Sequence, residues 1–175
     1  MRSALVLVPI LLFGLFTALL VPVLIRLTRR CAIREIPSDW LENFSVASYY
    51  PMEKLLAEED FKFLSRQPGF DLSLYRKLRR DRLHIFKQYL NRSIVDFNRL
   101  HAAVRAILPY IPEDRSDLAG RLIWLKVRFS CAAIRAEVSY RLCLLGIGTL
   151  AVHSLIAQLE DMSTHLNRVA AAQAG

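Results

Sequence analysis

The chain has 175 residues, a formal net charge of +8 and a hydrophobic fraction of 54%. Its three cysteines, Cys31, Cys131 and Cys143, are odd in number and widely spaced, which excludes the paired disulfide framework of small secreted domains. Once the apolar N-terminal segment is set aside, about 150 residues remain, enough for one modest domain.

An uncharged segment near the start of the chain extends from Ala4 to Ile25. About twenty apolar residues, each rising 1.5 Å, span the roughly 30 Å hydrocarbon layer of a bilayer, and a helix satisfies every backbone amide internally. A secretory signal peptide would have a shorter apolar run and a cleavage site of small residues. This run instead ends in Val23, Leu24 and Ile25. We predict an uncleaved transmembrane helix, with a cleaved signal and a buried core helix as the alternatives.

Basic residues beside the span predict its orientation. Four arginines follow it within nine residues: Arg26, Arg29, Arg30 and Arg34. Only Arg2 and the free amine precede the span, so the positive-inside rule places the rest of the chain in the cytoplasm. We assign residues 1–30 to the membrane anchor and its basic stop-transfer flank. The expected location is a bacterial inner membrane, crossed once, with the N-terminus outside.

Residues 31–50 are predicted to form a juxtamembrane linker. Trp40 lies close to the span, where an indole ring can sit at the level of the lipid headgroups. The alternative is that the aromatic side chains of the linker pack on the domain that follows.

The remaining sequence predicts an all-α helical domain at 51–168 and a disordered tail at 169–175. No segment alternates apolar and polar residues as a half-buried strand would. A short helix is expected at 51–65, because Pro51 suits its first position and Glu53 its first turn.

Two long helices are expected next, at 71–108 and 117–160, separated by a connector with two prolines. The first carries a coiled-coil-like seam at alternating steps of three and four residues: Leu83, Phe86, Leu90, Ser93, Phe97, Leu100, Val104 and Ile107. Because the connector is short, the two helices should form an antiparallel hairpin on the order of 50 Å long. We therefore predict a small helical bundle dominated by this hairpin.

The register of the hairpin follows from its turn. If the chain reverses near residue 112, positions whose numbers sum to about 225 face each other. Leu142 should then lie near Leu83, and His153 near Leu72. His153 has apolar sequence neighbours, so the default expectation is a buried imidazole with a hydrogen-bond partner.

A second apolar stretch, residues 142–159, has two interpretations. It carries no formal charge over about eighteen residues, which reaches the lower limit of a spanning helix. However, His153 and Gln158 are costly in lipid, and two glycines lower its helix propensity. We favour a buried helix where several helices converge, and keep a second membrane span or a helix lying in the membrane interface as the alternatives.

Five basic residues lie within seven positions of the first long helix: Arg76, Lys77, Arg79, Arg80 and Arg82. Basic clusters near an anchor are attracted to anionic headgroups at about 1 kcal/mol per residue. The preceding short helix and turn should place this basic cluster near the membrane end of the domain. Three interpretations stay open: a solvated helix face, a surface for anionic lipid, and a surface for nucleic acid or another acidic partner. Nucleic acid is not expected, because the cluster lacks interleaved aromatic residues and a reading motif.

No motif in the sequence predicts catalysis. The chain has no nucleophile with a base, no paired carboxylates, no zinc-binding histidine pair and no glycine-rich phosphate loop. We therefore expect neither an enzyme nor a cofactor or metal. The expected function is a membrane-anchored helical interaction or scaffold protein that presents its arginine-rich hairpin to anionic lipid, a partner protein or a second copy. The alternatives are a two-span accessory subunit and a membrane enzyme whose residues come from several helices.

Overall fold

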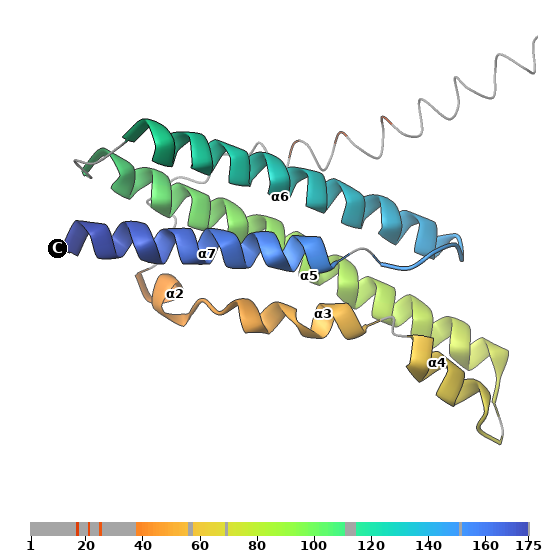
Figure 1. Ribbon diagram of the computed structural model, residues 1–175. Coiled ribbons are helices and arrows are strands. Elements are labelled where there is room, and N and C mark those ends of the chain that lie inside the picture. The colour runs from red at the N-terminus through yellow and green to blue at the C-terminus, as the bar shows by residue number, and fades with distance from the viewer. Residues whose placement is uncertain are drawn as a thin grey trace, which may run out of the picture.

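The computed structural model describes residues 38–55, 58–68, 70–110, 115–150 and 152–174, together with Thr17, Val21 and Ile25. The predicted span at 4–25, apart from these three residues, and the flanking Arg26, Arg29, Arg30 and Arg34 lie outside the described residues. Over the described ranges every regular element is helical, which confirms the all-α prediction (Figure 1). The elements in chain order are α2 (Ser38–Asn43), η2 (Val46–Tyr49), α3 (Pro51–Lys54), α4 (Glu58–Ser65), α5 (Leu72–Ile107), η3 (Leu108–Tyr110), α6 (Arg115–Leu144) and α7 (His153–Ala174).

The predicted antiparallel hairpin is formed by α5 and α6. Asp71 caps α5, since its carboxylate accepts the backbone N–H of Ser73 at 2.9 Å. Three cross-helix pairs have the predicted register: the Lys87 ammonium with the Glu137 carboxylate, the stacked rings of Phe97 and Phe129 with centroids 3.8 Å apart, and those of Phe86 and Tyr140 at 6.0 Å. The hairpin and its register are therefore confirmed.

The seam of α5 forms the centre of the core. Seven of its eight predicted residues are buried, and Ile107 at the end is half-buried. All of them except Leu83 and Ser93 pack in one cluster with buried residues of α6 and α7, including Leu125, Phe129, Leu155, Leu159 and Met162.

The single helix predicted at 117–160 is wrong, because α6 ends at Leu144. Gly146 and Gly148 adopt positive φ angles of 85° and 79°. The N–H of Ile147 bonds the carbonyl of Leu142 at 2.9 Å, and that of Gly146 bonds Cys143 at 3.1 Å. This pattern is a Schellman motif, in which a left-handed glycine ends the helix and satisfies its last carbonyls.

The second apolar stretch is thus divided between the end of α6, a loop and the start of α7. Val152, Leu155, Ile156 and Leu159 are buried, as the core interpretation predicted, but the loop residues 145–149 are exposed. Among the described residues, no helix combines the length and apolar character needed to cross a membrane.

Because α7 is a separate helix, two expectations about the C-terminal region are wrong. His153 is exposed at the start of α7, where its Nδ1 lies 3.2 Å from the Glu53 carboxylate rather than near Leu72. The tail predicted from residue 169 is helical to Ala174, because the buried Val169 follows Met162 by two turns on the core side of α7. As Figure 1 shows, α7 runs beside both α5 and α6.

The segment before α5 is also more ordered than a linker and a single short helix. Residues 38–55 run along the bundle as α2, η2 and α3, and the predicted helix at 51–65 is two helices, α3 and α4. Tyr49 and Met52 are fully buried, and the half-buried Trp40 ring lies 5.2 Å from the Arg99 guanidinium. The described part of the predicted linker therefore packs on the domain.

Candidate functional site

Two acidic residues, each with an arginine four positions away on the same helix, are buried. The first is Asp96, which is 3% exposed and accepts a hydrogen bond from the Tyr49 hydroxyl. Arg92 and Arg99 lie 3.6 and 3.5 Å from its carboxylate. Burial, and then the Asp96 charge, raise the pKa of Tyr49 above its ordinary value near 10, so Tyr49 stays a neutral donor. This contact attaches η2 to α5.

The second buried carboxylate is Glu137 of α6, which is 4% exposed. It accepts hydrogen bonds from Lys87 of α5 and from Arg141, whose Nε lies 3.2 Å away. Both carboxylates are paired within the bundle, and their role is to hold α5 against its neighbours.

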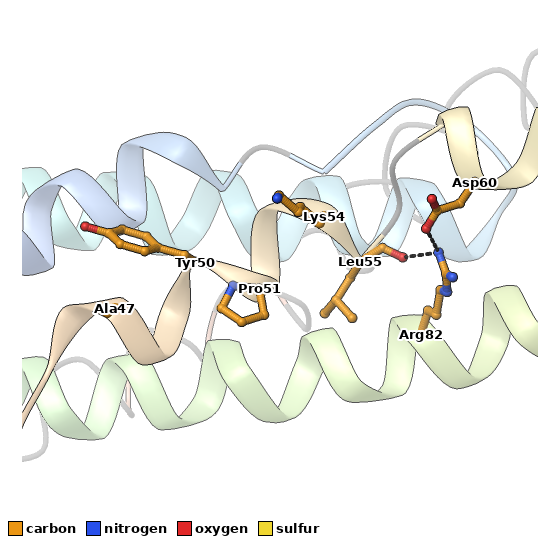
Figure 2. Close-up of a pocket in the computed structure, with 7 residues that line it drawn as sticks. All are labelled: Ala47, Tyr50, Pro51, Lys54, Leu55, Asp60 and Arg82. Atoms are coloured by element: carbon orange, nitrogen blue, oxygen red, sulfur yellow. Dashed lines mark hydrogen bonds and ion pairs between the residues drawn. The ribbon is translucent and has the colours of Figure 1, made fainter.

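One member of the predicted basic cluster also has a structural role. The Arg82 Nη1 donates to the Asp60 carboxylate at 2.8 Å and to the Leu55 carbonyl at 3.3 Å, which ties α4 to α5 (Figure 2). These residues line a groove of about 490 Å³ together with Ala47, Tyr50, Pro51 and Lys54. In Figure 2 the Arg82 guanidinium points to Asp60 and the Leu55 carbonyl, so its charge is already compensated there.

The other four members lie in the first three turns of α5, at the end of this helix that extends past α6 and α7 (Figure 1). Arg76, Lys77 and Arg80 are exposed, and Arg79 is half-buried. A side-chain carbon placed on Gly146 would lie 3.8 Å from the Arg79 guanidinium, so Arg79 lies against the loop between α6 and α7. Arg76 and Arg79 continue the seam of α5 at the same steps of three and four, in positions where every seam residue except Ser93 is apolar.

The loop beside Arg79 presents apolar side chains to solvent. Leu145 is 75% exposed and Ile147 is 60% exposed. Its other side is held to the core by Cys143, whose buried thiol donates to the Gly148 carbonyl at 3.4 Å. Four further exposed apolar side chains surround the turn between α4 and α5: Phe63, Phe70, Leu72 and Leu74. We call Arg76, Lys77, Arg79, Arg80, Leu145 and Ile147 the basic end of the bundle.

The basic end lies far from the place where the described chain begins. Trp40 contacts Arg99, which is twenty residues after Arg79 on α5, or about 30 Å at 1.5 Å per residue. Proximity of the cluster to the anchor was expected from the order of elements along the chain. The anchor lies outside the described residues, so this expectation stays a prediction. Residues 38–55 run along α5 from beside Arg99 to beside Arg82 before α4 begins.

The described residues contain no group of three or more His, Cys, Asp or Glu side chains placed to hold a metal ion. His101 and His165 are the titratable groups most affected by their surroundings in α5 and α7. Burial, and then the charges of Lys126 and Arg105, lower the pKa of His101 to about 4. Burial likewise lowers the pKa of His165, whose Nε2 has no hydrogen-bond partner among the described residues. Both imidazoles are neutral at pH 7.

Comparison with known proteins gives no relative. No family model matches the chain, and no significant match to a curated protein or a solved structure is found.

Sequence reasoning found the charged half of the basic end and missed its apolar half. Leu145 and Ile147 lie inside an uncharged run, which favours burial on composition alone. The signal that could have identified them is the pair Gly146 and Gly148, because two glycines one residue apart suit left-handed turn positions better than a helix interior.

Proposed function

We propose that the chain is a membrane-anchored helical bundle that binds anionic lipid headgroups through its basic end. The segment Ala4 to Ile25 supplies the anchor, and the bundle lies on the cytoplasmic side with Arg26, Arg29, Arg30 and Arg34 at the membrane boundary. The observation that carries the proposal is the exposed apolar loop, Leu145 to Ile147, lying against the cationic Arg79.

This combination favours a bilayer surface over a solvated helix face. A solvated face needs only charge, whereas Leu145 and Ile147 gain about 25 cal/mol for each Å² of apolar surface removed from water. Cationic side chains at the headgroups and apolar side chains just below them are the pattern of interfacial membrane contacts. The structure offers both within one end of the bundle.

The charge contribution can be worked out from the four cations at the basic end. At about 1 kcal/mol each near an anionic surface, Arg76, Lys77, Arg79 and Arg80 supply an upper limit of about 4 kcal/mol, or roughly a thousandfold in affinity. The attraction decays over about 8 Å at physiological ionic strength. It acts only when the basic end is close to the bilayer.

The test places a polarity-sensitive dye on Ile147→Cys in the full-length chain, reconstituted in vesicles. Cys31→Ser and Cys131→Ser remove two other thiols, so that the dye attaches at position 147. Cys143 is kept because it is buried and because burial raises the pKa of its thiol. We expect the dye emission to shift to shorter wavelength when phosphatidylglycerol is added to phosphatidylcholine. The double variant Arg76→Glu/Arg80→Glu should abolish the shift.

A matched control has the same change in charge on exposed residues elsewhere in the bundle, Arg105→Glu/Arg168→Glu. This variant should keep the shift. Emission that does not depend on lipid composition contradicts lipid binding and favours a protein partner for the basic end.

The anchor is tested separately by alkaline extraction of membranes. The chain should remain in the membrane pellet, and Leu12→Arg/Leu15→Arg should release it, because charged side chains at the centre of a span are costly. Release of the unaltered chain would contradict the anchor.

A further inference from the structure

Helix α6 is apolar on two opposite sides. One side faces the core with buried residues such as Leu122, Leu125 and Phe129. The other side is exposed, and its residues recur at helical spacing: Gly120, Ile123, Trp124, Val127, Cys131, Val138 and Leu142. We call these seven residues the outer stripe. Of them, Ile123, Trp124 and Val127 are more than half exposed.

The outer stripe is long and continuous. From Gly120 to Leu142 it covers about 33 Å at 1.5 Å per residue. Figure 1 shows α5 and α7 on one side of α6 and no other described helix on the opposite side. A helix that packs on its neighbours along one side alone needs only one apolar face, so a second one indicates a second contact.

The charges beside the outer stripe are all positive over most of its length. The sequence between Leu118 and Ala136 contains no acidic residue. Arg121, Arg128 and Arg135 follow one another at intervals of seven, so they lie along one border of the stripe. The Arg128 guanidinium lies 4.4 Å from the centre of the Trp124 ring, a cation–π contact at the edge of the apolar surface.

These charges distinguish an anionic bilayer from a second copy of the chain. Pairing two outer stripes antiparallel would place the arginine border of one α6 beside that of the other, because like border positions meet in antiparallel helix pairs. Parallel pairing offers no acidic residue between 118 and 136 as a partner. Phosphate headgroups complement these arginines, while the acyl boundary accepts Trp124 and Val127.

The outer stripe is also continuous with the basic end. It ends at Leu142, three residues before the exposed Leu145. Arg80 precedes Lys87 by two helical turns on the same side of α5, and Lys87 pairs with Glu137 of α6. The basic end and the last residue of the outer stripe therefore lie at the same end of the bundle.

We propose that α6 lies along the surface of an anionic bilayer, with the outer stripe in the acyl boundary and Arg121, Arg128 and Arg135 at the headgroups. This inference rests on the proposed lipid binding and deepens it, because it assigns the bundle a flat orientation. The basic end alone would allow the bundle to stand upright on the membrane.

The test uses Cys131, which is exposed at the midpoint of the outer stripe. A nitroxide on Cys131 is measured in the full-length Cys31→Ser chain, reconstituted in vesicles containing phosphatidylglycerol. We expect the ratio of oxygen to aqueous nickel-complex collisions to be severalfold higher than for a label on Glu160→Cys in a Cys31→Ser/Cys131→Ser chain. Glu160 is exposed on α7 and should report water.

The variant Val127→Glu/Val138→Glu should move the Cys131 label into water. Both valines are exposed, so the bundle should keep its helical circular dichroism and melting temperature. As a matched control, Thr164→Glu/Asn167→Glu places the same charges on exposed positions of α7 and should leave the label in the bilayer.

Three results separate the possible failures. A Cys131 label in water together with a lipid-dependent dye on Ile147→Cys overturns the flat orientation and leaves lipid binding by the basic end intact. Loss of both signals overturns both proposals. Spin–spin broadening at Cys131 that disappears when labelled protein is diluted with unlabelled protein assigns the outer stripe to a second copy and overturns this inference.

Discussion

The buried pair formed by Tyr49 and Asp96 predicts that the folded state loses stability at alkaline pH. Tyr49 is 1% exposed, and burial and then the neighbouring carboxylate raise the pKa of its hydroxyl. In the unfolded chain the hydroxyl loses its proton near pH 10. Since the pKa is raised in the folded state, the stabilising effect is complete below pH 10 and is lost as the pH rises above it. The free energy of unfolding should then fall by about 1.4 kcal/mol per pH unit from Tyr49 alone.

The variant Tyr49→Phe isolates this contribution. At pH 7 it removes one hydrogen bond to a carboxylate, but Arg92 and Arg99 remain beside Asp96. We expect a loss of about 1.5 to 3 kcal/mol, the range for hydrogen bonds to charged groups. Asp96→Ala should cost more, because it leaves a buried hydroxyl without an acceptor and removes the partner of two arginines.

The measurement is denaturant unfolding of the full-length chain in detergent, followed by circular dichroism between pH 7 and 11. The unaltered chain and Tyr49→Phe share their other titrating groups, so the difference between their unfolding free energies isolates Tyr49. That difference should shrink steadily above pH 10. A constant difference over the whole range would refute the reasoning, since it would mean that the Tyr49 hydroxyl titrates alike in both states.

Three further predictions concern the bundle. Glu137→Ala removes the carboxylate that pairs with the partly buried Lys87 and should lower the free energy of unfolding by about 2 to 4 kcal/mol. This loss is somewhat below the usual cost of breaking a buried ion pair, because Lys87 reaches solvent. A melting curve unchanged from the parent contradicts this prediction. Gly146→Ala should lower the free energy of unfolding by about 1 to 2 kcal/mol, because an alanine is strained at the positive φ of this position. Steric contact adds nothing, since an added carbon meets no atom closer than 3.8 Å. The control is the same substitution at Gly120, where no positive φ causes strain. The His101 imidazole should titrate near pH 4 by NMR. The free energy of unfolding should decrease as the pH falls from 6.5 toward 4, and His101→Phe should remove this dependence. Titration near pH 6.5 would show that the ring is solvated.

The hairpin could be predicted because its determinants are local. Asp71 and Pro109 mark the ends of α5, a short connector sets the register, and the seam repeats along one helix. The burial of Asp96 and Glu137 could not be predicted in this way. Each has a basic residue four positions away, which is the pattern of a surface pair, and the contacts that bury them come from residues about fifty positions distant.

The candidate site could likewise be predicted only where its residues are neighbours in the sequence. A run of cations is visible in any sequence, so Arg76 to Arg80 could be found directly. The different role of Arg82 depends on Asp60, twenty-two positions earlier, and no spacing rule links the two. The apolar half depends on where α6 stops, which the backbone conformation of Gly146 decides.

The path of residues 38–55 along the bundle has a mechanical consequence. The described chain begins beside Arg99, whereas the basic end lies about 30 Å away along α5. If the chain is anchored as proposed, residues 26–37 reach at most about 40 Å, and the anchor would keep the basic end within a short distance of the same bilayer. The two attachments then act as a bivalent ligand, with an effective local concentration in the millimolar range. Headgroup contacts that would be too weak to recruit a free protein are sufficient to hold this one down, and a modest change in lipid charge can release one end while the other stays fastened.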